Sequence, residues 1–228
     1  MIRSVIFDID GTLNDWETAI DRALSDVLAE VPAAHRDGLP SRLRQAVHDY
    51  AVVLRDSLVV DRKYWLLLLD PLPPWRAALA GAAPELAESL AERFQSRLEA
   101  VPYGDAAPAL EALRDRSRLG VLSNSPRSDD LLTQLGLHHY FHAVVSAEEP
   151  ERKPHPEAFL RACQALGTTP AEAVYVGDSL ANDVEGALAA GLVPVWLDRY
   201  GEGYPLPAGA HRVTSLEELP PLLAALSS

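Results

Sequence analysis

The chain has 228 residues, of which 48% are hydrophobic, and its formal net charge is −13. This length and balance are typical of a folded globular protein with one large domain or two small ones, and they exclude a disordered chain. The negative charge argues against nucleic acid polymers and anionic membranes as partners, because both bind basic patches. A small anion at a locally positive site remains compatible with it.

The N-terminus has no apolar core of signal-peptide length, and no apolar run approaches the roughly 18–20 residues that span a bilayer. The single cysteine, Cys163, cannot form an internal disulfide. It lies in a helical pattern, where we expect a buried structural thiol. We therefore expect a cytoplasmic protein.

In chain order, the first apolar run is residues 5–7, which predicts a buried strand that leads directly into two carboxylates. Residues 15–103 carry apolar side chains at helical spacing and no clear strand signal. The simplest interpretation is a helical module inserted after the first strand, with hinges near residues 14–15 and 101–104. The apolar positions of this module are Trp16, Ile20, Leu24, Val27 and Val31, then Leu39, Leu43, Val47, Tyr50 and Leu54, and later Leu86, Leu90, Phe94 and Leu98.

The remaining chain alternates short apolar runs with helical patterns, and each pattern closes on a glycine in the position of a helix C-cap. Ser215 and Glu218 have the spacing of a capping box, which predicts the start of a last helix. This rhythm predicts an α/β fold with a parallel sheet and helices on both faces. The runs cover residues 119–124, 142–148, 173–178 and 193–198, and the glycines are Gly136, Gly167 and Gly191.

Polar residues follow the predicted strands where ligands bind in such folds, beyond the carboxyl ends of the strands. Asp8 and Asp10 stand two positions apart on an extended segment, so their carboxylates point roughly the same way and repel each other. A cation is therefore expected beside them. The candidate residues are Asp8 and Asp10 after the first run, Ser123 and Asn124 after the second, Lys153 after the third, and Asp178 and Asp183 after the fourth.

These residue types suit phosphoryl transfer. The carboxylates are hard oxygen donors of the kind that Mg²⁺ prefers. Ser123 and Asn124 offer a hydroxyl, an amide and backbone N–H groups to a small oxyanion. Lys153 supplies a point positive charge. An acid, a metal, an oxyanion cradle and a lysine together describe this chemistry.

Four segments resemble the ordered motifs of the haloacid dehalogenase superfamily: DIDGTL at residues 8–13, SN at 123–124, KP at 153–154 and GDSLAND at 177–183. They occur in the expected order, each at or just beyond a predicted strand end. The resemblance implies a Rossmann-like three-layer core of residues 1–14 and 104–228. It also implies that residues 15–103 form an inserted α-helical cap.

The resemblance further implies roles for the first two carboxylates. Asp8 is similar to the nucleophile that forms an aspartyl-phosphate, and Asp10 to the general acid that then acts as the base. The implied cofactor is Mg²⁺, held by the carboxylates of Asp8 and Asp178 and by the backbone carbonyl of Asp10. Asp183 would be an outer metal ligand, or would hold Asp178 or Lys153.

For the remaining motif residues the resemblance implies contact with phosphate or support of the loop. Gly11 and Thr12 would let the backbone approach the phosphoryl group and buttress the loop. Ser123 and Asn124 would bind the phosphate, and Lys153 would neutralise charge in the reaction.

The residue at position 10 separates the branches of the superfamily. Dehalogenases resemble D-x-Y there and need no metal, so Asp10 favours a Mg²⁺-dependent phosphatase. A phosphomutase shares the same core, and a phosphonate-cleaving enzyme would need a cap lysine, for which Lys63 is the one candidate in the insert.

A non-enzymatic alternative is a receiver module that is switched by a phosphoaspartate. Such modules are shorter, have no insert after the first strand, and carry the phosphoacceptor at a later strand end. We therefore expect a phosphatase acting on a small phosphorylated metabolite. Nucleotide monophosphates, phosphoglycolate and sugar phosphates all remain open as substrates.

Overall fold

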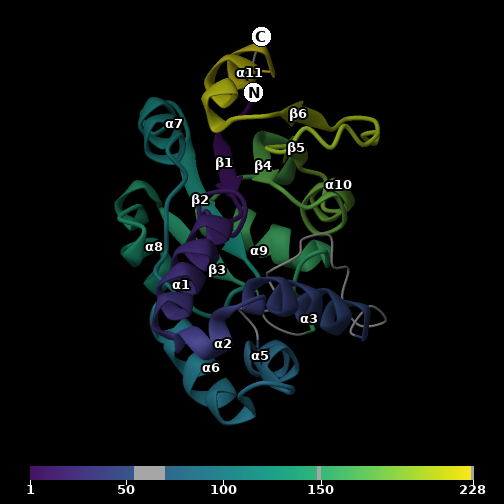
Figure 1. The fold of residues 1–228 in the computed structure, drawn as a ribbon. Helices are drawn as coiled ribbons and strands as arrows, with labels where there is room; N and C mark the ends of the chain where they lie inside the picture. Colours follow the sequence, from purple (N-terminus) through teal and green to yellow (C-terminus); the bar gives the residue numbers. More distant parts are fainter. Residues whose placement is uncertain (54–69, 148–149, 227–228) are drawn as a thin grey trace. The chain divides into compact units, whose positions relative to one another are not determined.

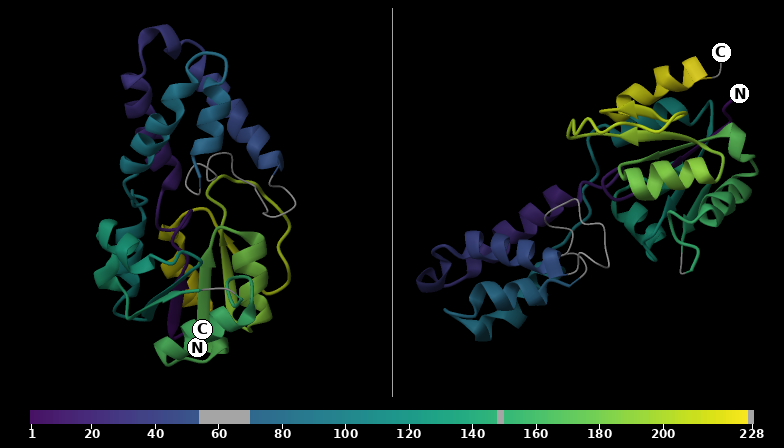
Figure 2. Two further views of the ribbon diagram at one scale, coloured as in Figure 1. Left: turned by 90° about the horizontal axis from the view of Figure 1, so that it is seen from below. Right: turned by 90° about the vertical axis from the view of Figure 1, so that its right-hand side faces the viewer.

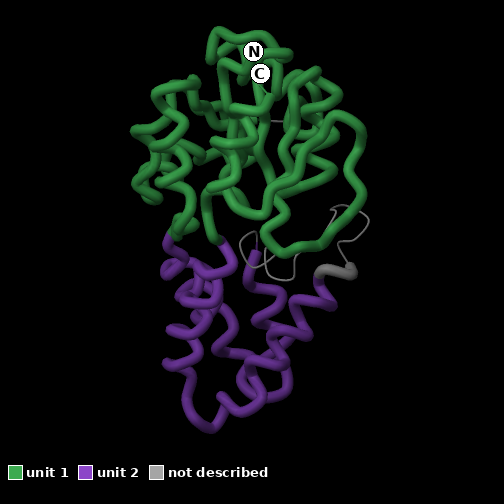
Figure 3. The backbone as a smooth tube through the Cα atoms, turned by 90° about the horizontal axis from the view of Figure 1, so that it is seen from above, with its two compact units in different colours: residues 1–15, 100–228 green, residues 16–99 purple. Residues whose placement is uncertain are grey.

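The structure is a computed structural model that describes residues 1–53, 70–147 and 150–226. The chain divides into two compact units, Met1–Asp15 with Ala100–Ser228 and Trp16–Glu99 (Figure 3). Among the described residues, no helix is both long and apolar enough to cross a membrane. Leu54 and Lys63, which the sequence analysis singled out, lie outside the described residues.

The larger unit is built on a six-stranded parallel sheet with the strand order β3-β2-β1-β4-β5-β6 (Figure 1). All five predicted apolar runs are confirmed as strands. The sixth strand was not predicted, because only one of its three residues is apolar and they give no apolar run. The strands are β1 (Ser4–Phe7), β2 (Arg118–Ser123), β3 (Ala143–Ser146), β4 (Ala173–Gly177), β5 (Val193–Leu197) and β6 (His211–Val213).

Helices cover both faces of this sheet, as the alternation along the chain predicts. Successive side chains of β1 serve opposite faces: Val5 and Phe7 pack in one apolar cluster and Ile6 in another. In the right-hand view of Figure 2 the yellow helix α11 and the green helices lie on opposite sides of the sheet. The first cluster includes α7 (Ala106–Leu113), α8 (Ser128–Gln134) and α11 (Leu219–Leu226), and the second includes α9 (Pro156–Leu166) and α10 (Gly186–Ala189).

Local signals at the helix ends are also confirmed. Gly167 ends α9 in the left-handed conformation, with φ 62°. Ser215 and Glu218 form the predicted capping box before the 3₁₀ turn η5 (Leu216–Glu218). His155 caps the start of α9, where its Nδ1 accepts a hydrogen bond from the backbone N–H of Glu157 at 3.2 Å. A short polar side chain there satisfies one of the free N–H groups of the first turn.

The single cysteine has the structural role that the sequence predicts. Cys163 lies on the inner face of α9, and its thiol is free and buried. Burial raises the pKa of this thiol to about 11, which keeps it protonated at neutral pH and therefore a poor nucleophile.

The smaller unit is helical and has a core of its own. Trp75 and Phe94 are fully buried in it together with Ile20. Its apolar positions follow the helical spacing expected from the sequence. The helices are α1 (Trp16–Glu30), α2 (Ala33–Arg36), α3 (Leu39–Val53), α5 (Leu72–Leu79) and α6 (Ala87–Ser96), with the 3₁₀ turn η1 (Pro84–Leu86).

Asp105 anchors the start of α7 within the larger unit. Its carboxylate accepts two hydrogen bonds from the guanidinium of Arg199, both at 2.9 Å, and one each from the Ser215 hydroxyl and the Leu216 backbone N–H. The same guanidinium donates to the backbone carbonyl of Thr12 at 2.9 Å. Burial alone would raise the pKa of Asp105, but these donors outweigh it and hold the pKa below its usual value.

Asp105→Asn should therefore cost stability in a pH-dependent way. An unfolded aspartate titrates near pH ~3.9, and the folded pKa lies lower, so the ionised contacts stabilise the protein at neutral pH and are lost as pH falls through the folded value. We expect a loss of about 2 kcal/mol at neutral pH that shrinks below pH ~4, measured by urea denaturation. Asp115→Asn, at a carboxylate that is 90% exposed, is the control. A pH-independent loss would contradict the ionic origin.

Candidate active site

The site lies where the strand order departs from the chain order, between β1 and its neighbour β4. Phe7, the last residue of β1, pairs with Val176 of β4 and with Val121 of β2. Asp8 and Asp178 directly follow β1 and β4, so parallel pairing brings their backbones to the same edge of the sheet. Such a switch point is where ligands bind in doubly wound sheets.

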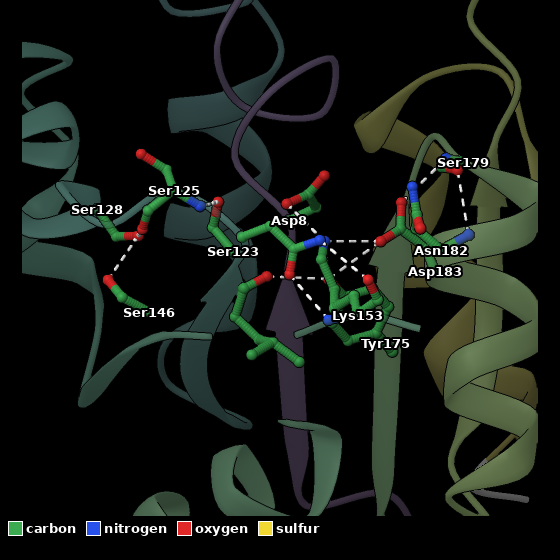
Figure 4. Close-up of polar contacts among 12 residues, drawn as sticks. Asp8, Ser123, Ser125, Ser128, Ser146, Lys153, Tyr175, Ser179, Asn182 and Asp183 are labelled. Carbon is green, nitrogen blue, oxygen red and sulfur yellow. Dashed lines mark hydrogen bonds and ion pairs between the residues drawn. The ribbon is translucent and has the colours of Figure 1, made fainter. Parts of the chain in front are cut away.

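Lys153 connects the candidate carboxylates. Its Nζ lies 2.8 Å from Oδ1 of Asp8, 2.7 Å from Oδ1 of Asp183 and 2.8 Å from the hydroxyl of Tyr175 (Figure 4). An ammonium group has three N–H donors, and these three acceptors use all of them. The lysine is buried, so each partner counts: a buried charge without partners is strongly unfavourable.

Asp183 is engaged by the protein through both of its oxygens. Oδ1 binds Lys153, and Oδ2 accepts the backbone N–H of Ser179 at 2.9 Å. Asp183 belongs to the π-helix η4 (Leu180–Glu185), which begins just after the fourth motif turns away from β4. Of the two roles expected for Asp183, the contacts place it against Lys153.

Gly177 explains why the fourth motif begins with a glycine. A Cβ atom built at Gly177 would lie 2.3 Å from Oδ2 of Asp183 and 2.4 Å from its Cγ. These are rigidly held atoms and could not move aside without breaking the contacts of Asp183. The glycine therefore makes room for the carboxylate that holds Lys153.

The charges at the site are strongly coupled. Burial raises the pKa of Asp8, the ammonium of Lys153 opposes this, and the carboxylates of Asp183 and Asp178 add to it, so that the pKa lies well above its ordinary value. For Lys153 burial disfavours the charge, but Asp183 and Asp8 outweigh it and raise the pKa. The lysine is thus a permanent cation, and the site as a whole carries an excess of negative charge.

This excess fits a divalent cation. Asp8, Asp178 and Asp183 each offer a carboxylate oxygen, and these oxygens lie within 4.8 Å of one another. Three carboxylates against the one ammonium of Lys153 leave two negative charges when all are ionised. Hard oxygen donors with this charge suit Mg²⁺. Asp8 and Asp178 stay the predicted direct ligands, and Asp183 is held within the protein through both of its oxygens.

Asp10 is held by Asn14. The side-chain amide of Asn14 donates to Oδ1 of Asp10 at 2.8 Å. Burial raises the pKa of Asp10, and the hydrogen bond from Asn14 and the charge of Lys153 oppose this without cancelling it. A carboxyl group with a raised pKa holds a proton closer to neutral pH, as a general acid requires.

Gly11 and Thr12 form the turn that follows Asp10. Gly11 has φ 77°, and its N–H donates to the carbonyl of Asn14 at 3.0 Å. The left-handed conformation favours glycine, because a Cβ would be strained there. The side chain of Thr12 is fully buried and its carbonyl accepts from Arg199. These contacts support the loop, and the buried Thr12 hydroxyl has no hydrogen-bond partner among the described residues.

Ser123 ends β2, and its hydroxyl accepts the backbone N–H of Ser125 at 3.1 Å. The side chain of Asn124 contacts the segment that carries Lys153. Its amide donates to the backbone carbonyl of Lys153 at 3.1 Å, and its oxygen accepts the Lys153 N–H at 2.8 Å. The amide thus fixes the backbone that carries the lysine, and phosphate binding by Asn124 stays a prediction.

Three residues with contacts in the site were missed by the sequence analysis. Tyr175 accepts from Lys153 and donates to the Leu122 carbonyl at 2.9 Å. Trp196 donates from its indole N–H to the backbone carbonyl of Asp178 at 2.9 Å. Asn14 holds Asp10. The only signal for the first two was a ring with a polar group inside a buried strand, since such groups need a partner.

Comparison with known proteins agrees with this arrangement. The family model of the haloacid dehalogenase-like hydrolases matches residues 2–191. The chain therefore belongs to the haloacid dehalogenase-like hydrolases, as the four motifs predicted. The matched range includes both the strand ends that carry the candidate residues and the helical insert.

Individual relatives include two phosphatases and a dehalogenase. The chain is 32% identical to a glyceraldehyde 3-phosphate phosphatase of Methanopyrus kandleri, over 87% of this chain and 85% of the relative. It is 31% identical to the N-acylneuraminate-9-phosphatase of Rattus norvegicus, over 99% of this chain and 95% of the relative. Its structure is similar to that of a 2-haloacid dehalogenase from Pseudomonas syringae pv. Tomato DC3000, with a TM-score of 0.63 and 28% sequence identity. The match covers 99% of this chain and 100% of the dehalogenase.

Proposed function

We propose that this protein is a Mg²⁺-dependent phosphatase that hydrolyses a small phosphomonoester through an aspartyl-phosphate on Asp8. The observation that carries the proposal is the pairing of two carboxylates with different surroundings at the end of β1. Asp8 is bound to the ammonium of Lys153, whereas Asp10 is bound to the neutral side-chain amide of Asn14. Two carboxyl groups in such different environments can divide the roles of nucleophile and acid.

In the first half of the reaction, a carboxylate oxygen of Asp8 attacks phosphorus and the bond from phosphorus to the ester oxygen breaks. The Asp10 carboxyl gives its proton to the departing oxygen, which leaves as an alcohol. Lys153 offsets the charge of Asp8 and keeps its carboxylate in one orientation. Asp183 and Tyr175 in turn hold the ammonium group in place.

In the second half, a water molecule attacks the phosphorus of the aspartyl-phosphate. Asp10, now a carboxylate, accepts a proton from this water, and the bond between phosphorus and Asp8 breaks. Inorganic phosphate leaves, Asp8 is again ionised, and Asp10 is again protonated. Each half thus needs Asp10 in the protonation state that the other half produces.

Asp8 and Asp178 would hold the magnesium ion through their carboxylates, and Asp10 through its backbone carbonyl. When bound, the ion would supply positive charge against the phosphoryl oxygens and the excess negative charge of the site. The assignment of residues 15–103 as a helical cap stays a prediction from the sequence.

The test is phosphate release by the purified protein from a panel of esters, after chelation and after addition of Mg²⁺. The panel contains glyceraldehyde 3-phosphate, N-acylneuraminate 9-phosphate, phosphoglycolate and nucleotide monophosphates, because two of these are named for the similar phosphatases. We expect little release under excess chelator and recovery on adding Mg²⁺. Full activity with excess chelator would contradict the proposal.

A dehalogenase is the second candidate, because a solved 2-haloacid dehalogenase is similar over the whole chain. Both reactions use an aspartate nucleophile, so the same preparation is assayed for halide release from 2-chloropropionate without metal. We expect no halide release. Metal-independent halide release without phosphate release would assign the chain to the dehalogenase branch.

A further inference from the structure

Asn14 lies between the proposed acid–base group and the segment that returns from the helical unit. Its side-chain N–H₂ donates to Oδ1 of Asp10 at 2.8 Å, and its side-chain oxygen accepts the backbone N–H of Val101 at 3.2 Å. Asn14 is also buried, with 6% of its surface exposed. Both ends of one short side chain are therefore in use.

The two partners fix which way the amide points. The backbone N–H of Val101 can only donate, so it must face the oxygen of Asn14. The N–H₂ group then faces Asp10, as a carboxylate requires. If the amide were reversed, its oxygen would face the Asp10 carboxylate and its N–H₂ group would face the Val101 N–H, so neither hydrogen bond could form.

The backbone of Asn14 is held as firmly as its side chain. Its N–H donates to the Ile9 carbonyl at 2.8 Å, and its carbonyl accepts the N–H of Gly11 at 3.0 Å. Asn14 also forms a bridge with Pro102 of the returning segment. The side chain that reaches Asp10 thus starts from a backbone with little freedom, which is what a positioning group needs.

We propose that Asn14 is a positioning residue for Asp10, which it holds in the orientation for proton transfer by anchoring it to the returning segment at Val101. The inference rests on the proposed phosphatase function. A misplaced acid lowers kcat/KM strongly where the leaving oxygen needs a proton, as in an alkyl phosphate. It costs little for 2,4-dinitrophenyl phosphate, whose leaving group departs as a stable anion.

The experiment compares kcat/KM on an alkyl phosphate, chosen from those that the wild type hydrolyses, with kcat/KM on 2,4-dinitrophenyl phosphate. This constant covers the steps up to the aspartyl-phosphate and so reports the acid and not the later base. We expect Asn14→Leu, of similar size, to lower kcat/KM by about 10–100-fold on the alkyl ester and by less than about threefold on the aryl ester. Equal losses on both substrates would overturn the proposal.

Asn14→Asp separates the two halves of the contact. It keeps an acceptor for Val101 but sets a carboxylate against Asp10, so we expect a loss on the alkyl ester at least as large as in Asn14→Leu. If Asn14→Asp instead restored the wild-type ratio, the role would be packing of the linker alone, and the proposal would fail.

Arg199→Met is the matched control, because Arg199 donates to the Thr12 carbonyl of the same loop and, among the described hydrogen bonds, makes none to Asp10. General loosening of the loop should lower kcat/KM on both substrates by the same factor. The same substrate dependence in Arg199→Met as in Asn14→Leu would overturn the assignment to Asn14. The wild type reports separately on the proposed function: if it hydrolyses neither ester, the phosphatase proposal itself fails.

Discussion

We expect Asp8→Asn to abolish phosphate release, with a fall in kcat on the order of 10⁵-fold or more, because the amide cannot form the aspartyl-phosphate. The substitution keeps the size of the side chain and an oxygen for Lys153, so the fold should persist. The measurement is phosphate release from an aryl phosphate at saturating Mg²⁺. Acid-quenched wild type should also yield a hydroxylamine-sensitive acyl phosphate that the variant lacks.

Asp10→Asn provides the comparison. It removes the proton donor but leaves the nucleophile, so we expect a smaller loss, on the order of 10²–10⁴-fold. Asp115→Asn, on an exposed carboxylate far along the chain, should be fully active. Activity of Asp8→Asn within tenfold of the wild type would rule out Asp8 as the nucleophile.

The strand ends were predictable because one physical rule places them. Parallel strands bring their carboxyl ends to the same edge, so the polar residues after each apolar run had to converge. Asp8 and Lys153, 145 positions apart in the chain, lie 2.8 Å from each other in the structure. The capping box at Ser215 and the glycine at Gly167 were predictable for a different reason, since both act within a single turn.

The contacts that support the site could not be predicted in the same way. Tyr175 lies in an apolar run, where alternation tells which face a ring occupies but not which donor its hydroxyl meets. Arg199 and Asp105 are 94 positions apart and have no local pattern that links them. The contact of the Asn124 amide with the backbone of Lys153 was not predicted either. Such choices depend on distances of a few tenths of an ångström that the sequence does not encode locally.

Lys153→Met tests the other half of the site, because it removes the only ammonium bound to Asp8 and Asp183 among the described contacts. Two buried carboxylates would then face each other without compensation. Loss of one partner from a buried ion pair costs about 3–5 kcal/mol of unfolding free energy. We expect a loss of that size at neutral pH, measured by urea denaturation, together with a large fall in kcat.

The loss should shrink as pH falls, as that of Asp105→Asn does, but it should begin to shrink at a higher pH. Burial and the neighbouring carboxylates already raise the pKa of Asp8, and removing Lys153 takes away the charge that lowers it. Protonation then relieves the repulsion, so the variant should regain stability as pH falls from neutral toward the folded pKa of Asp8. A stability loss that is the same at every pH would instead point to lost packing of the lysine stem.

Lys153→Met combined with Asp183→Asn completes the argument. If the cost arises from unpaired charge, removing one carboxylate should restore much of the stability at neutral pH, although Asp183→Asn alone should be destabilising. Activity should not return with stability, because Asp8 still lacks the cation that orients it. A double variant as unstable as Lys153→Met would show that the ammonium stabilises the protein in some way other than by pairing with these carboxylates.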